Sequence, residues 1–177
     1  MALSHRRCQR GSAIVTDYGL DLAVIGNRRT ARAFTAPINS DELDASVLLL
    51  PELGLVEPNE PKFVSTVEVV DQELRREHHV MRYVGSDDFG LPKTAFLICR
   101  FWLIDALWLI GRRDEVRERF IEALKLRNRY GLLSEDVHPI TGALWGNFPQ
   151  TYSMAGLVLT AMRLSRSWEG RYWRSSS

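Results

Sequence analysis

The chain of 177 residues is long enough to form one ordinary domain with a sizeable hydrophobic core. Its 23 Lys and Arg against 22 Asp and Glu give a net charge of +1, so no overall basic field favours binding to nucleic acid or to an anionic membrane. Cys8 and Cys99 stand far apart, and no spacing with the four histidines is typical of a zinc site. We therefore expect reduced thiols, no metal, no cofactor and a cytoplasmic location.

The sequence shows no convincing export or membrane segment. Asp17 and Asp21 interrupt what would be the apolar core of a signal peptide. The longest apolar run, 95–111, carries Arg100 and Asp105, and each charge at bilayer depth would cost about 3 kcal/mol. We expect a buried helix there, in which these two charged groups must reach water, a partner or a binding pit.

The first elements in chain order are a segment without a clear pattern and a capped helix. Residues 1–30 lack any clear period and stay poorly defined. In "SDELDASVLLLPELG", Ser40 can serve as an N-cap, and acidic residues follow in the first turn. The pattern predicts a helix that starts near Asp41 and is closed by Pro51 and Gly54.

The middle of the chain predicts a second helix and then a short strand. Pro61 is tolerated in a first helical turn. The apolar residues after it recur at helical spacing: Phe63, Val64, Val67, Val70 and Leu74. The stretch "HHVMRYV" (78–84) predicts a short strand, and "GSDDFGLP" (85–92) predicts a loop.

Three further helices are predicted towards the end of the chain. The first, over about 94–111, is apolar on every side. The second follows "GRR" with one apolar stripe, and the third runs from about Pro149 to Arg166. A buried helix followed by an amphipathic one is typical of an inner and an outer layer. We predict an all-α fold of stacked antiparallel helical hairpins that allows one short strand or hairpin.

Three stretches together resemble one protein family. "LDASVLLLPELGLV" (43–56), "AFLICRFWLIDALWLIGRRDEVRERFIEALKLRNRYGLLSED" (95–136) and "TGALWGNFPQTYS" (141–153) are similar, in order and spacing, to the C-terminal part of bacterial glycoside hydrolase family 15 proteins. Those proteins are glucoamylase and trehalase-like enzymes. The resemblance covers roughly residues 30–166.

The resemblance implies a fold and a reaction. It implies that residues 31–167 form part of an (α/α)6 toroid whose loops line a sugar-binding pit, with 168–177 as a tail and 1–30 as an undefined segment. It also implies inverting hydrolysis of α-glucosidic bonds by two carboxyl groups, about 6.5–9.5 Å apart. One group protonates the leaving oxygen, and the other activates a water molecule.

The resemblance assigns one of these carboxyl groups. The family's general base is the glutamate of a "GLL-S/P-E" motif, and "GLLSE" (131–135) matches it, so Glu135 is the candidate base. The general acid belongs to a "WE"-type motif further upstream, and no tryptophan precedes Trp102 here. We expect a C-terminal part that retains the base, lacks the acid and is inactive alone, which leaves its status as an enzyme uncertain.

Five other residues are candidates for substrate binding. Asn147 and Gln150 either bond to sugar hydroxyls or hold the catalytic loop by bonds to its backbone. Trp145 either stacks on a sugar ring or packs against protein. Arg82 either touches sugar hydroxyls or lies on the surface, and Trp102 either lines the pit or belongs to the core.

Two functions remain open at this point. The first is a glucoamylase or trehalase-like hydrolase whose ligand is an α-glucoside or a trehalose-type sugar. The alternative is a non-catalytic helical interaction protein, or a subunit that assembles with a second polypeptide supplying the missing helices, because an open partial toroid would expose apolar faces.

Overall fold

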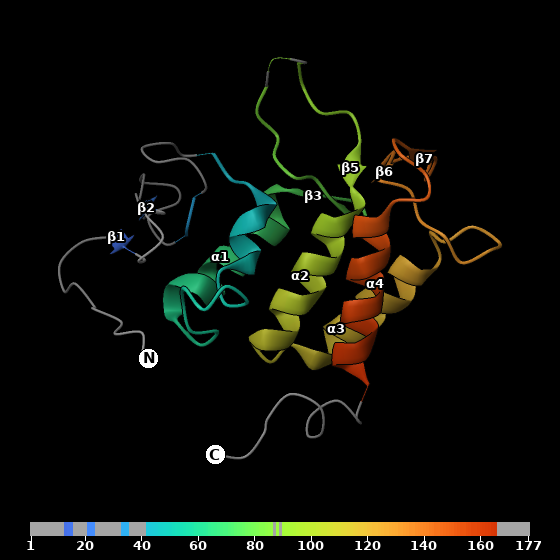
Figure 1. Cartoon of the computed structure of the whole chain (residues 1–177). Coiled ribbons are helices and arrows are strands. Elements are labelled where there is room, and N and C mark those ends of the chain that lie inside the picture. Colours follow the sequence, from blue (N-terminus) through green and yellow to red (C-terminus); the bar gives the residue numbers. More distant parts are fainter. Residues whose placement is uncertain are drawn as a thin grey trace.

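The computed structural model describes residues 13–15, 21–23, 33–35, 42–86, 88 and 90–165. In this part the chain is mainly helical (Figure 1). The helices are α1 (Pro61–Glu73), α2 (Leu97–Leu109), α3 (Arg113–Leu124), α4 (Thr151–Leu164) and the 3-10 helix η1 (Ala45–Leu49). The strands are β1 (Ala13–Val15), β2 (Asp21–Ala23), β3 (Arg75–Arg76), β4 (His79–Val80), β5 (Ala95–Phe96), β6 (Asp136–Val137) and β7 (Leu144–Trp145).

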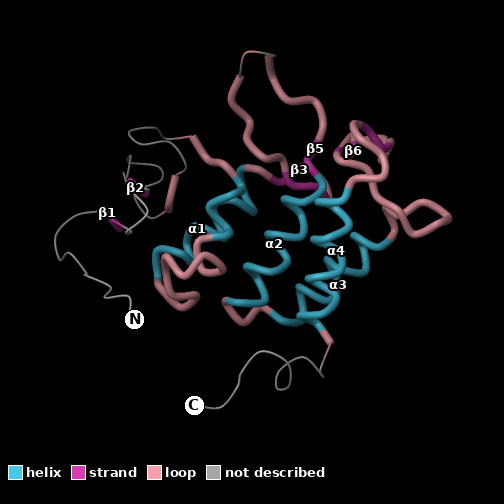
Figure 2. Tube along the Cα trace, in the orientation of Figure 1, coloured by secondary structure: helices cyan, strands magenta, loops and turns pink. Residues whose placement is uncertain are grey.

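Helix α2 lies at the centre, and α1, η1, α3 and α4 all pack against it (Figure 2). Its side chains are buried on nearly every side, as an all-round apolar helix requires. The predicted helix over 94–111 is confirmed, although it begins at Leu97 because Ala95 and Phe96 pair as strand β5 instead. The predicted helices from Pro61, after "GRR" and towards Arg166 are also confirmed as α1, α3 and α4.

Helices α3 and α4 each cover one side of α2. Gly111, at a φ of +89°, lies in the short turn that reverses the chain between α2 and α3, which together form a helical hairpin. Gly156 lets α4 approach α2 closely, because a Cβ atom there would lie 2.5 Å from Ile98 Cδ1 and 3.0 Å from Phe101 Cδ2. A closed ring needs more helices than the described residues contain, so the (α/α)6 toroid stays a prediction.

The helix predicted to start near Asp41 is wrong in type and extent. The structure instead has the five-residue 3-10 helix η1, whose N-cap Asp44 accepts a hydrogen bond from the backbone N–H of Ser46 at 2.8 Å. The predicted N-cap Ser40 lies outside the described residues, as does Asp41. Helices of the 3-10 type are usually short, and this one ends two residues before Pro51.

Short strands join segments that are far apart in the sequence. Strands β3 and β4 form a two-residue antiparallel hairpin, so the strand predicted over 78–84 is confirmed only at His79 and Val80. Strands β5, β6 and β7 form an antiparallel sheet in which Phe96 faces Asp136 and Asp136 faces Trp145. This sheet lies at the end of the molecule where α2 and α4 begin (Figure 1).

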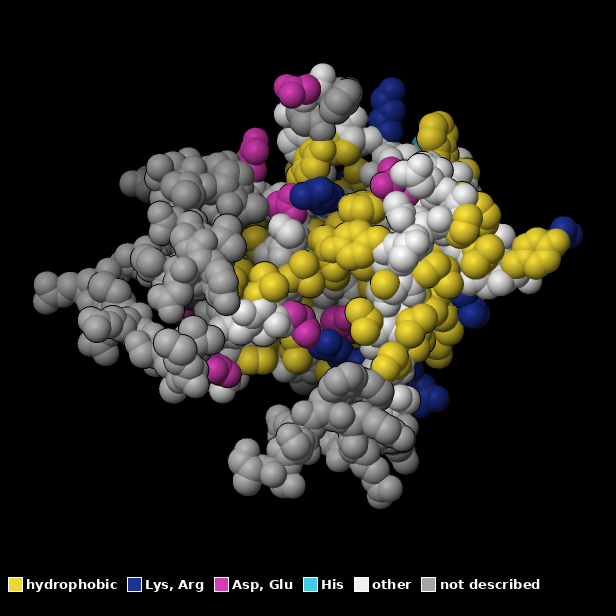
Figure 3. Space-filling view, in the orientation of Figure 1, with side chains coloured by type: hydrophobic (Ala, Val, Ile, Leu, Met, Phe, Trp, Pro, Cys, Tyr) yellow, Lys and Arg dark blue, Asp and Glu magenta, His cyan; other side chains and the backbone are white. Residues whose placement is uncertain are grey.

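Helix α4 carries an apolar face that no other described element covers. Tyr152, Val158 and Leu159 are about half exposed, and hydrophobic side chains gather on the face of the molecule shown in Figure 3. Exposed apolar patches of this kind mark surfaces that bind partners or ligands. Within the described part of the chain, every helix is too short or too polar to cross a lipid bilayer.

Candidate functional site

The backbone of Glu135 is held on both sides. Its carbonyl oxygen accepts a hydrogen bond of 2.9 Å from the N–H of Leu97, the first residue of α2. Its own N–H donates to the carbonyl oxygen of Asn147, also at 2.9 Å. Glu135 therefore sits between the start of the central helix and the segment that follows β7.

The side chain of Glu135 is half-buried and bonded to Asn147. Its Oε2 atom accepts a hydrogen bond of 2.8 Å from Asn147 Nδ2 and another of 3.1 Å from the Asn147 backbone N–H. The structure therefore brings together the candidate base and one of the predicted polar partners. Hydrogen bonds from N–H groups to a carboxylate are charge-assisted and stronger than neutral ones.

Asp136, the neighbouring carboxylate, is engaged elsewhere. Its Oδ2 atom accepts a hydrogen bond of 2.8 Å from the Thr94 hydroxyl, across the β5–β6 pair. Burial, together with the negative charge of Glu135, raises the pKa of Asp136, and the hydrogen bond from Thr94 opposes the rise. Adjacent residues of extended chain point to opposite faces, so Asp136 does not share the surroundings of Glu135.

Gln150 fixes the start of α4 against the same segment. Its backbone N–H donates to the carbonyl oxygen of Leu133 at 2.9 Å. Its side-chain oxygen caps the helix by accepting a hydrogen bond of 3.4 Å from the N–H of Tyr152. The side-chain oxygen of Gln150 thus bonds to backbone, which is one of the two alternatives predicted for it.

Aromatic rings line the surface next to this segment. Tyr152 stands edge-on to Phe96, with ring centroids 6.2 Å apart, and edge-on to Trp102 at 5.9 Å. Trp102 is only 9% exposed, whereas Tyr152 is half exposed. Trp102 therefore lies in the core, with the half-exposed ring of Tyr152 against it.

Trp145 and Arg82 are the two remaining residues predicted to bind substrate. Trp145 is 56% exposed on β7, opposite Asp136. Arg82 forms an ion pair of 3.1 Å with Asp44. Burial raises the pKa of the Cys99 thiol in α2, the negative charges of Asp44 and Asp136 add to the rise, and the charge of Arg82 opposes it.

Sequence reasoning missed several residues of this site. Thr94 donates a hydrogen bond to Asp136, the backbone of Gly146 lies against Glu135, and Tyr152 provides a half-exposed ring on α4. Only Tyr152 had a visible signal, since it completes the cluster of aromatic residues around "NFPQ". The roles of Thr94 and Gly146 depend on strand pairing, which has no local signature.

Two hollows among the described residues lie away from Glu135. One, of about 380 Å³, is lined by Arg100 with residues of β4 and α3, and another, of about 860 Å³, lies beside Trp108. Arg100 is buried, and its Nη2 donates to the Arg119 carbonyl oxygen at 3.4 Å. Burial lowers the pKa of Arg100 to about 10, with Glu122 opposing this and Arg119 adding to it. Arg100 thus reaches a partner, the backbone of Arg119 in α3, which is one of the alternatives predicted for it.

A half-buried carboxylate that is held by fixed N–H donors can accept a proton from water. The sequence of the chain matches the family model of glycosyl hydrolases family 15 over residues 27–113. Its curated relatives include a trehalase of Thermoplasma acidophilum, 32% identical over 83% of this chain and 26% of the relative. A trehalase of Mycobacterium tuberculosis is 32% identical over 77% of this chain and 20% of the relative.

Fewer residues of this chain lie outside the match to the Thermoplasma acidophilum trehalase than follow Glu135. The matched region therefore includes Glu135, wherever that region begins. Among solved structures, a wild-type glycosidase superposes with a TM-score of 0.64 at 21% identity, over 75% of this chain and 38% of that chain. A variant glycosidase in complex with glucose gives a TM-score of 0.63 at 19% identity, over the same shares. These structures show a common fold. The chain is therefore related to glycoside hydrolase family 15, and it spans a fifth to a quarter of the length of the trehalases that it matches.

Proposed function

We propose that this chain supplies the water-activating half of an inverting hydrolysis of α-glucosidic bonds, with Glu135 as the general base. The observation that carries the proposal is the placement of the Glu135 carboxylate, which is half-buried and bonded to Asn147. The half-exposed ring of Tyr152 belongs to the helix that follows this segment. Apolar ring faces and a positioned carboxylate are what a sugar site requires.

The reaction follows from this geometry. Glu135 accepts a proton from a water molecule, whose oxygen forms a bond to the anomeric carbon as the bond to the leaving oxygen breaks. The leaving oxygen must take a proton from an acid. Asp136 is unsuited to that role, since Thr94 donates to it and it lies on the other face of the strand. We assign the proton donor to protein outside this chain.

A substrate whose leaving group needs no proton tests the proposal directly. The purified chain should release fluoride from α-D-glucosyl fluoride, because fluoride departs as an anion without acid catalysis. β-Glucose should form first, as measured by NMR. Maltose and trehalose, whose leaving oxygen needs a proton, should react roughly 10²–10⁴-fold more slowly.

Two variants control this measurement. Glu135→Gln should lower fluoride release by at least about 100-fold, because an amide cannot accept the proton. Glu118→Gln, which changes an exposed glutamate of α3, should release fluoride at the rate of the unchanged chain. Release that does not exceed the rate in buffer, or α-glucose as the first product, would contradict the proposal.

A second candidate function rests on the uncovered face of α4. We infer that Tyr152, Val158 and Leu159 pack against helices of a second polypeptide, or of a longer protein, that complete the fold. The chain spans only part of the length of the trehalases that it matches, which supports additional helices as the partner of this face. Light scattering should show self-association of the chain alone, relieved by Leu159→Lys but not by Leu53→Lys, which changes an exposed leucine outside α4. A monomer that melts cooperatively would contradict this role.

A further inference from the structure

The two oxygens of the Glu135 carboxylate have different surroundings. Oε2 accepts both N–H groups of Asn147, at 2.8 Å from the side-chain amide and 3.1 Å from the backbone. Within the described residues, Oε1 accepts no hydrogen bond shown by the structure. One oxygen is therefore saturated by fixed donors, whereas the other keeps its lone pairs for a ligand.

Gly146 places the backbone close against the same oxygen. Its φ is +76°, a conformation that favours glycine. A Cβ atom at position 146 would lie 2.9 Å from both Cβ and Oε2 of Glu135. Any larger residue would push Oε2 away from the donors of Asn147, so the bare backbone of Gly146 is part of the arrangement.

The backbone pairing makes this contact rigid. The N–H of Glu135 donates to the carbonyl oxygen of Asn147, while the N–H of Asn147 donates to the Glu135 side chain. The two residues thus bond to each other in both directions. Strands β6 and β7 form the antiparallel pair that this contact extends.

We propose that Asn147 is a positioning residue that holds Oε2 of Glu135 so that Oε1 is the atom that accepts the proton from water. The inference rests on the proposed function for its chemical meaning. Water gives its proton to Oε1, its oxygen bonds to the anomeric carbon, and the leaving group departs with the electrons of the broken bond. Rotation of the carboxylate, which would aim Oε1 elsewhere, is prevented by the two donors on Oε2.

NMR of side-chain amides tests the contact without any need for activity. In ¹⁵N-labelled chain, one Asn147 Nδ2 proton should resonate downfield, because it donates to a carboxylate. Glu135→Gln should move that signal upfield, since the partner loses its charge. The amide signals of Gln150, whose side-chain oxygen caps α4 by accepting from Tyr152, should stay in place. An Asn147 signal that Glu135→Gln leaves unchanged would overturn the proposal.

Kinetics with α-D-glucosyl fluoride test the positioning role. Asn147→Ala keeps the backbone donor and removes the side-chain donor, so kcat should fall roughly 10- to 100-fold while KM stays within about twofold. Asn147→Ser, which keeps a short hydroxyl donor, should recover part of kcat and guards against a misfolded alanine variant. An unchanged kcat in folded Asn147→Ala would overturn the inference. Absence of turnover in the unchanged chain would overturn the proposed function, while the amide signals would still decide the contact.

Discussion

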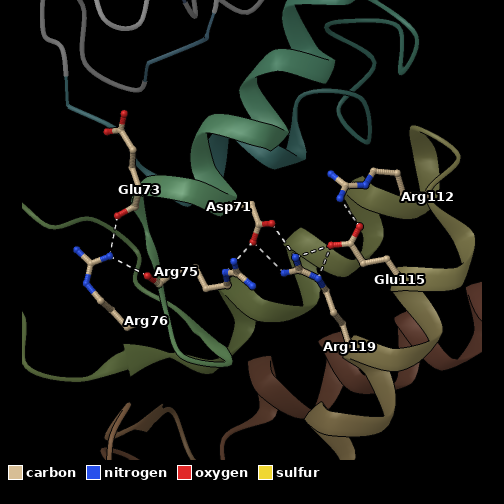
Figure 4. A network of polar contacts seen from close by, with 7 residues as sticks. All are labelled: Asp71, Glu73, Arg75, Arg76, Arg112, Glu115 and Arg119. Atoms are coloured by element: carbon tan, nitrogen blue, oxygen red, sulfur yellow. Dashed lines mark hydrogen bonds and ion pairs between the residues drawn. The ribbon is translucent and has the colours of Figure 1, made fainter.

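Replacing Asp71 with alanine is expected to lower the free energy of unfolding by about 3 kcal/mol, since it removes one partner of a buried ion pair together with both hydrogen bonds that this partner accepts. Asp71 is buried in α1, and its two oxygens accept hydrogen bonds of 2.8 and 2.7 Å from Arg119 of α3 (Figure 4). Arg75 lies 3.4 Å from the same carboxylate. Loss of Asp71 would leave Arg119 with Glu115 as its remaining carboxylate.

Denaturant unfolding measures this effect. Glu73→Ala is the matched control, because Glu73 lies on the same helix, is exposed, and bonds to Arg76 only through its backbone carbonyl (Figure 4). Its free energy of unfolding should change by less than about 0.5 kcal/mol. A double-mutant cycle with Arg119→Met isolates the coupling between Asp71 and Arg119. A loss below about 1 kcal/mol in Asp71→Ala would show that the network is dispensable.

The stability of the fold is expected to fall as the pH rises from about 4 to 6 through the ionisation of Asp105. Burial in α2 raises the pKa of Asp105 from 3.8 to about 6, while Arg163, 3.6 Å away, opposes the rise and Glu52 adds to it. Between these pH values the folded state keeps a proton that the unfolded state has released. The contribution amounts to roughly 3 kcal/mol, which is lost above pH 6.

Asp105→Asn should remove this dependence, because its amide resembles the protonated acid and never ionises. The variant should be more stable than the unchanged chain at pH 7 and equal to it near pH 4, as measured by denaturant unfolding across the pH range. His79 also titrates in this range. Burial, together with the charges of Arg100 and His78, lowers the pKa of His79 to about 4. Taking the difference between the two proteins cancels its contribution. Parallel stability curves would contradict the assignment to Asp105.

The sequence predicted what local periodicity controls. Helices α2 and α3 were predictable because their apolar residues repeat along 97–109 and 113–124. The two-residue strands β5, β6 and β7 were not, because each is stabilised only by pairing with a distant segment.

The same division applies to the candidate site. Glu135 was predicted as the base from the motif "GLLSE", and its role as a base stays a proposal. Asn147 was predicted either to bond to sugar or to hold the catalytic loop, and the structure shows the contact to Glu135. The raised pKa of Asp105 depends on the packing of α2 against α4, and the partner of Arg100 depends on the packing of α2 against α3, so no pattern along the chain could have predicted them.

The hydrogen bond from Leu97 to the carbonyl oxygen of Glu135 joins the first residue of the central helix to the candidate base. The position of the Glu135 carboxylate relative to the protein interior therefore depends on the position of α2. A substitution deep beneath α2 that slid this helix along its axis would carry Glu135 with it, without altering any residue that meets solvent. Transplanting 132–150 into a foreign scaffold would therefore move the chemical groups while leaving their alignment behind.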